Sequence, residues 1–166
     1  MNGDSPNMYK AVIADGYSPV STRRGRVEIH EKHGSNEKVA NTETAKYLAD
    51  KHGYKIKLLP DWKINGRSVP DSFNETLGTF QEYKHCTTAT KSAIDNELRK
   101  GNKQARSVVI RISSDISLEN LRDGLSDRIR RTRLKSVTLI RNGKDVTYFR
   151  QKILGPGFKI KQSDFK

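Results

Sequence analysis

The chain has 166 residues, of which 33% are hydrophobic and 31% are charged, and its formal net charge is +13. This length suits one domain with a real core, and the only cysteine, Cys86, excludes an internal disulfide or a thiolate metal cluster. No apolar run approaches the roughly 20 residues that cross a bilayer, and the N-terminus lacks the pattern of a secretory signal. The excess of cations favours a polyanionic partner, with nucleic acid first and an anionic membrane surface second.

Residues 1–34 are punctuated by Asn, Gly, Ser and Pro, and we expect an N-terminal arm with at most a short strand or hairpin. Three arginines of this arm, Arg23, Arg24 and Arg26, could contact phosphate, but a solvated basic turn is the preferred interpretation. His30 and His33 lie close together, but isolated histidines in a polar segment are typical of exposed positions rather than of a metal site.

The folded body is predicted between residues 35 and 154. A helical pattern starts near Asn36 and stops at Gly53, and it places Glu43 on the face that is expected to pack inward. This glutamate either reaches water from the edge of the core or contributes to a site. Residues 54–59 alternate like a half-buried strand, and the pair Asn65-Gly66 that follows is typical of a hairpin turn.

The run from Pro70 to Lys84 carries the main hypothesis. An extended chain sends Glu82 and Lys84 to the same side of a strand, and a preceding strand with Asp71 on that side would add a second carboxylate. Two carboxylates and an ammonium group suit a divalent metal beside a phosphate. Asp61 belongs to another Pro-Asp pair. We prefer Asp71 because the chain between it and Glu82 has room for a strand and a tight turn.

The second half of the body alternates helices and strands. The sequence predicts a helix over residues 89–104 and a strand covered on both faces over residues 107–112. Ser117 is the predicted N-cap of another helix. The end of that helix carries more cations than its dipole requires. The side chains predicted to contact nucleic acid are Lys91, Lys100, Arg128, Arg130, Arg131 and Arg133. Residues 136–149 predict a hairpin around Asn142-Gly143, and residues 155–166 a mobile basic tail.

Pro70-Asp71 followed by Glu82-Tyr83-Lys84 resembles the PD-(D/E)XK nuclease superfamily. When the flanking sequence from about Val39 to Phe149 is included, the chain resembles a narrower group: the C-terminal nuclease modules of CdiA-type contact-dependent inhibition toxins and related modules of phage head proteins. The predicted elements fit an α/β fold of this kind: an α-β-β-β-α-β core with a central mixed sheet flanked by helices, plus an extra helix and a C-terminal hairpin. Such a module acts in the cytoplasm as part of a larger delivered or phage protein.

The resemblance implies a metal-dependent endonuclease that cleaves DNA or tRNA. It assigns catalytic roles to Asp71, Glu82, Lys84 and Gln104, and metal binding to Asp71, Glu82 and Glu43. The expected metal is Mg²⁺ or Mn²⁺, with Zn²⁺ as a second option because His85 is adjacent. A toxin of this kind would need an acidic immunity protein as its partner. The oligomeric state stays open.

Two other functions compete with this one. The first is a metal-independent RNase of the barnase, colicin or RelE type, which would use His85, Lys84, Thr88 or Ser92, and Arg131. The second is a nucleic-acid-binding module without catalysis. EDTA distinguishes the first from a metal enzyme, because a metal-independent RNase stays active in EDTA. Glu82→Ala distinguishes the second, because in a nuclease this variant should still bind nucleic acid but no longer cleave it. We expect alanine at Asp71 or Glu82 to leave the fold intact, because a carboxylate in a cleft contributes little to packing.

Overall fold

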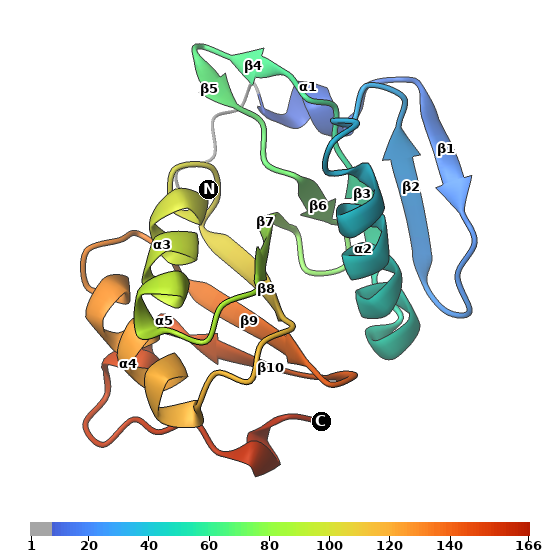
Figure 1. The fold of residues 1–166 in the computed structure, drawn as a ribbon. Coiled ribbons are helices and arrows are strands. Elements are labelled where there is room, and N and C mark those ends of the chain that lie inside the picture. Colours follow the sequence, from blue (N-terminus) through green and yellow to red (C-terminus); the bar gives the residue numbers. More distant parts are fainter. Residues whose placement is uncertain (1–7) are drawn as a thin grey trace. The chain divides into compact units, whose positions relative to one another are not determined.

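Helices and strands alternate along residues 8–166, which are the residues that the computed structural model describes (Figure 1). They form two units, and the boundary between the units falls between Glu82 and Tyr83. The boundary lies inside one strand, β7 (Thr79–Cys86), so the first unit contains the start of that strand and the second unit its end.

The first unit is a mixed sheet with strand order β1-β2-β3-β6-β7. Strands β2 and β3 are parallel, and the other neighbouring strands of this unit are antiparallel. Because parallel neighbours need a crossover connection, the helix α2 links β2 to β3. The elements of this unit are α1 (Tyr9–Val12), β1 (Tyr17–Val20), β2 (Arg26–His30), α2 (Lys38–His52), β3 (Lys55–Leu58), the separate hairpin β4 (Lys63–Ile64) and β5 (Arg67–Ser68), and β6 (Ser72–Asn74).

Helix α2 ends where the sequence predicts. Gly53 has φ 71°, and its N–H donates to the carbonyl of Ala49 at 2.7 Å, as in a left-handed helix end that favours glycine. The start differs slightly, because Glu37 rather than Asn36 occupies the N-cap position and makes no side-chain cap. The helix packs on β2 and β3 through a stripe that includes Ala45 and Leu48 (Figure 1).

The predicted N-terminal arm contributes to this sheet. Residues 17–30 form the β1–β2 hairpin, and β2 pairs with β3 along its length. His33 is therefore buried rather than exposed: Nδ1 lies 2.6 Å from the carbonyl oxygen of Leu59 and Nε2 lies 3.0 Å from Nδ2 of Asn41. His30 is also buried, against Tyr17 and Trp62. The prediction of exposure is wrong because the partners of both histidines come from distant parts of the chain.

The second unit has the strand order β8-β9-β10, with β8 and β9 parallel and β9 and β10 antiparallel. Helix α4 makes the crossover between the two parallel strands. The elements are α3 (Lys91–Gly101), β8 (Ser107–Ile112), α4 (Leu118–Ile129), β9 (Ser136–Arg141), β10 (Lys144–Phe149), α5 (Arg150–Leu154) and the 3₁₀ turn η2 (Gln162–Asp164).

Helices α3 and α4 lie side by side against this sheet (Figure 1). Their crossing requires Gly124, because a Cβ atom there would lie 2.9 Å from Cβ of Ile94. Fully buried side chains from both helices, including Leu98 and Leu125, pack with Ile110 of β8 in one core. This close packing fixes the two helices relative to each other.

Local signals predict several elements of this unit correctly. Ser117 Oγ accepts the backbone N–H of Asn120 at 3.0 Å, which confirms the N-cap of α4. Asn142 and Gly143 have φ 53° and 72°, which confirms the hairpin turn between β9 and β10. The prediction for α3 is too long, because the helix ends at Gly101 and leaves Gln104 in the turn that follows.

Residues 155–166 pack against the second unit instead of extending as a mobile tail. Phe158, Ile160 and Phe165 are buried in its core. The backbones of Asp145 and Lys166 exchange two hydrogen bonds of 3.1 Å. The Gly155-Pro156-Gly157 run that suggested the end of the domain is only a turn, since the apolar residues after it return to the core.

The fold class is as predicted: mixed α/β, with the order α2-β3-β6-β7-α3-β8 for the α-β-β-β-α-β core, sheets flanked by helices, and an additional helix and hairpin. Among residues 8–166, no helix combines the length and the apolar composition needed to span a membrane.

Candidate functional site

Asp71 and Glu82 face each other on neighbouring chain segments. Strands β6 and β7 are antiparallel with Ser72 opposite Gln81, and continuing this register by one residue places Asp71 opposite Glu82. The backbone N–H of Asp71 donates to Oε1 of Glu82 at 3.0 Å. The structure therefore brings together the two carboxylate residues that the sequence singles out.

The surroundings of the two carboxylates differ. Only 2% of Glu82 is exposed, whereas Asp71 is half-buried. Strand alternation places Glu82 on the same side of β7 as Phe80, which packs with Tyr9 of α1. Glu82 is thus buried on the side of β7 that carries Phe80, and its Oε1 accepts a backbone N–H.

Lys84 follows Glu82 by two residues on β7, so the two side chains project from the same side of this strand. Lys84 is half-buried. This local geometry is the one expected for an acid-x-Lys triplet on a strand.

Asp61 lies in a different place. Its backbone N–H donates to the carbonyl of Lys32 at 2.8 Å, and its exposed side chain lies beside Gly34. The strand pairing therefore favours Asp71, not Asp61, as the neighbour of Glu82.

Glu43 and Gln104 belong to elements other than β6 and β7. Glu43 is exposed on α2, whose buried side chains are not part of the apolar cluster around Phe80. Within residues 8–166, no three His, Cys, Asp or Glu side chains are arranged to hold a metal ion, and the metal-binding role of Glu43 stays a prediction. Gln104 is half-buried in the turn after α3, in the second unit.

The oxygen donors of Asp71 and Glu82 fit a hard divalent cation. Mg²⁺ keeps several waters and is commonly bound by one or two protein carboxylates together with substrate phosphates. A pair of carboxylates, with one oxygen of Glu82 already fixed by an N–H group, is a suitable donor set for such an ion. A closed protein cage with three or more ligands is not needed for this chemistry.

His85, the central residue of the rival RNase hypothesis, is exposed at the end of β7. Its Nε2 lies 3.0 Å from Oγ of Ser113, a residue that the sequence analysis did not consider. Of the hydroxyls that it did consider, Ser92 pairs with Thr90 at 3.1 Å. No local sequence signal links residues 85 and 113, because their proximity depends on the positions of two different strands.

The predicted nucleic-acid contacts fall into two groups. Arg128 makes a bidentate ion pair with Asp95, with N···O distances of 3.0 and 2.8 Å, and Lys91 pairs with Asp127. The Arg128 guanidinium holds the pKa of the Asp95 carboxyl below its usual range. These two cations join α3 to α4, which gives them a structural role that the sequence analysis did not predict.

The remaining cations form a surface at the C-terminal ends of α3 and α4. The backbone N–H of Arg133 donates to Oδ1 of Asn102 at 2.9 Å, which joins the segment after α4 to the end of α3. The charges of Arg99 and Arg131 both act on Asp95, so these two arginines lie near the same carboxylate. We call this exposed surface the helix-end rim, and it consists of Arg99, Lys100, Lys103, Arg130, Arg131 and Arg133.

The helix-end rim contains two cations that the sequence analysis missed, Arg99 and Lys103. Basic residues in the last turn of a helix compensate its dipole, so neither attracts notice alone. Six exposed cations at two adjoining helix ends are more than the dipoles require.

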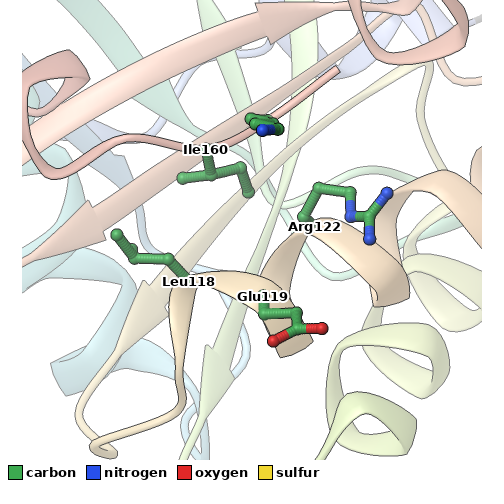
Figure 2. Close-up of a pocket in the computed structure, with 5 residues that line it drawn as sticks. Leu118, Glu119, Arg122 and Ile160 are labelled. Carbon is green, nitrogen blue, oxygen red and sulfur yellow. The ribbon is translucent and has the colours of Figure 1, made fainter. Parts of the chain in front are cut away.

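A separate hollow of about 300 Å³ lies in the second unit between α4 and the C-terminal segment. Figure 2 shows Leu118 and Ile160 on its apolar side and Glu119 and Arg122 projecting from α4, and Lys159 also lines it. Its lining has an apolar floor and charges of both signs, and it contains no pair of carboxylates for metal-assisted hydrolysis.

No protein-family model matches the chain, and comparison with curated proteins gives no match. Among solved structures, the chain is similar to a chain of the CdiA-CT/CdiI toxin and immunity complex from Burkholderia pseudomallei. The two are 18% identical, the alignment covers 69% of this chain and 86% of that one, and the TM-score is 0.48. A TM-score below 0.5 does not establish a shared fold, so this similarity carries no functional assignment to the present chain.

Proposed function

We propose that this chain is a metal-dependent endonuclease that hydrolyses phosphodiester bonds in DNA or tRNA. The observation that carries the proposal is the placement of Asp71 opposite Glu82, with the buried Glu82 carboxylate fixed by the Asp71 N–H. Lys84 follows two residues after Glu82 along the same strand, which is the order of the acid-x-Lys triplet in the motif.

In this proposal Asp71 and Glu82 would hold Mg²⁺ or Mn²⁺, and the bound ion would polarise the phosphate and lower the pKa of a coordinated water. Lys84 would donate to a phosphate oxygen and offset the charge that develops there. Gln104 would orient the water or the phosphate, a role that rests on the motif resemblance alone. The buried position of Glu82 excludes bulk water and strengthens its electrostatic interactions.

The helix-end rim is the proposed contact for the nucleic-acid backbone. Cations that neutralise phosphates release counterions, so they provide affinity without reading sequence. The net charge of +13 steers polyanions toward the protein over a distance of about one Debye length, roughly 8 Å at physiological salt.

We further propose that the chain is the effector module of a toxin and that the producing cell holds an acidic immunity protein. The motif resemblance and the net charge support this part of the proposal. An acidic partner would associate rapidly with so basic a surface and would block access of the substrate.

The purified chain should be incubated with plasmid, tRNA and total RNA, each with Mg²⁺, Mn²⁺, Zn²⁺ or EDTA. We expect cleavage of at least one substrate with Mg²⁺ or Mn²⁺ and none with EDTA. Cleavage of RNA that persists in EDTA would refute the metal-dependent mechanism and support the RNase alternative around His85. Binding without cleavage under every condition would support the non-catalytic module.

A further inference from the structure

The turn between β1 and β2 packs closely against the C-terminal end of α2, in the first unit. Gly25 has φ 62°, and a Cβ atom there would lie 2.2 Å from the carbonyl oxygen of Tyr54. A Cβ atom at Gly53 would lie 3.2 Å from a guanidinium nitrogen of Arg24. Gly25 therefore permits a backbone approach that a side chain would block, and the basic turn is fixed in place rather than solvated on all sides.

Hydrogen bonds to α2 hold this turn. Oδ1 of Asp50 accepts the backbone N–H groups of Arg23 at 2.6 Å and Arg24 at 3.3 Å. Nη1 of Arg24 donates to the carbonyl of Lys51 at 3.1 Å. The N–H of Arg23 is the main reason that the pKa of Asp50 lies below its usual range. Asp50 is thus ionised and already engaged by the turn that it holds.

These contacts leave a hollow of about 440 Å³, which we call the α2-end pocket. Its volume falls within the range of small-molecule sites. Three of its five lining residues are cations, one is an aromatic residue and one is the engaged carboxylate: Arg23, Arg24, Lys51, Tyr47 and Asp50.

The side chain of Arg23 is 92% exposed, and its ion pair with Asp50 is long, at 3.9 Å. Arg26, the first residue of β2, is different. It forms ion pairs of 3.3 Å with Glu28 and with Glu75, and it does not line the pocket. Two carboxylates pair closely with Arg26, whereas among residues 8–166 the side chain of Arg23 has only the long ion pair with Asp50 and lines the pocket.

We propose that the α2-end pocket binds a phosphate and the adjoining nucleoside of a nucleic-acid strand. Guanidinium groups match the geometry of phosphate oxygens, and Lys51 adds a third positive charge. Tyr47 supplies an aromatic surface of the kind on which bases stack. The inference rests on the proposed nucleic-acid substrate, and it adds a contact in the first unit to the helix-end rim of the second.

The first test measures binding of a short labelled oligodeoxythymidylate by fluorescence polarisation in EDTA, over a range of salt concentrations. Arg23→Ala is the main variant, because its exposed side chain contributes little to the fold. Arg26→Ala is the matched control, since it removes the same charge three residues away, at the start of β2. We expect Arg23→Ala to reduce the slope of log K against log salt by about 1. Arg26→Ala should leave the slope unchanged.

The outcomes separate this inference from the proposed function. If the wild-type chain does not bind the oligonucleotide, the nucleic-acid function and the pocket assignment both fail. If it binds and the slopes of Arg23→Ala and Arg26→Ala are equal, only the pocket assignment fails.

A second test identifies the ligand by titrating ¹⁵N-labelled protein with AMP or with inorganic phosphate. We expect amide shifts at Arg23, Arg24 and Lys51 with both ligands, and at Tyr47 with AMP alone. Equal shifts with the two ligands would overturn the nucleoside part of the proposal. Shifts confined to the helix-end rim would overturn the pocket site.

Discussion

Replacing Glu82 by glutamine or by alanine separates its chemical role from its structural role. The carboxylate is buried and accepts the Asp71 N–H at 3.0 Å. Glutamine keeps an acceptor oxygen in nearly the same volume but removes the charge. Alanine removes both, and it leaves the Asp71 N–H without this acceptor.

The two variants should differ in stability. A hydrogen bond to a charged group contributes about 1.5–3 kcal/mol, and a buried donor left without a partner costs about 1–3 kcal/mol. We expect Glu82→Ala to lower the free energy of unfolding by about 2–3 kcal/mol, and Glu82→Gln by about 1 kcal/mol or less. The hydrogen bond therefore predicts a cost in stability for alanine at Glu82, and the same unfolding measurement tests the sequence-based expectation that the fold stays intact.

The two variants should be alike in activity. A neutral amide is a weaker ligand for Mg²⁺ than a carboxylate, so both variants should lose roughly 100-fold or more of the cleavage rate. Urea unfolding and a plasmid or tRNA cleavage assay measure the two effects, with Glu119→Gln on the exposed face of α4 as the control. Full cleavage by Glu82→Gln would refute the metal-binding role. Equal destabilisation by both variants would refute the role assigned to the hydrogen bond.

Three further predictions use other parts of the chain. Asp71→Asn should abolish metal-dependent cleavage and Asp61→Asn should not, and the opposite result in the same assay would identify Asp61 as the ligand. The three arginines after α4 are Arg130, Arg131 and Arg133. Alanine at all three should reduce the slope of log K against log salt by about 2–3. Arg128→Ala should instead chiefly lower the melting temperature, because it breaks the ion pair with Asp95. Deleting residues 155–166 should unfold the second unit, because three buried apolar side chains contribute about 1.5–3 kcal/mol each, and a truncated chain with unchanged circular dichroism and melting would contradict this.

The sequence predicts elements whose signals are local. The Asn-Gly turns, the Ser117 cap and the Gly53 helix end each depend on the conformational preferences of one or two residues, and the structure contains all of them. The burial of His33 and of residues 155–166 depends on partners far away in the chain. Composition within a short window cannot reveal such partners, and for this reason the predicted arm and tail differ from the structure.

The same distinction applies to the candidate site. Asp71 and Glu82 could be identified because a single hairpin connects them, so their sequence separation nearly determines their register. Glu43 could not be placed, because its side-chain direction depends on how a separate helix packs. The helical pattern predicts that Glu43 faces inward, but its side chain is exposed on α2.

The sequence does not determine which cations are paired with carboxylates and which are exposed. Arg128 and Arg131 are one helical turn apart, but Arg128 is engaged by Asp95 of the neighbouring helix whereas Arg131 is exposed on the helix-end rim. Arg23 and Arg26 show a similar contrast in the first unit, because Arg26 pairs at 3.3 Å with Glu28 and Glu75 whereas Arg23 is 92% exposed. A count of positive charges predicts a polyanionic partner, but only the positions of the carboxylates determine which cations can reach it. The binding surfaces should therefore be mapped with single variants of exposed arginines, each compared with a neighbouring arginine that is already paired.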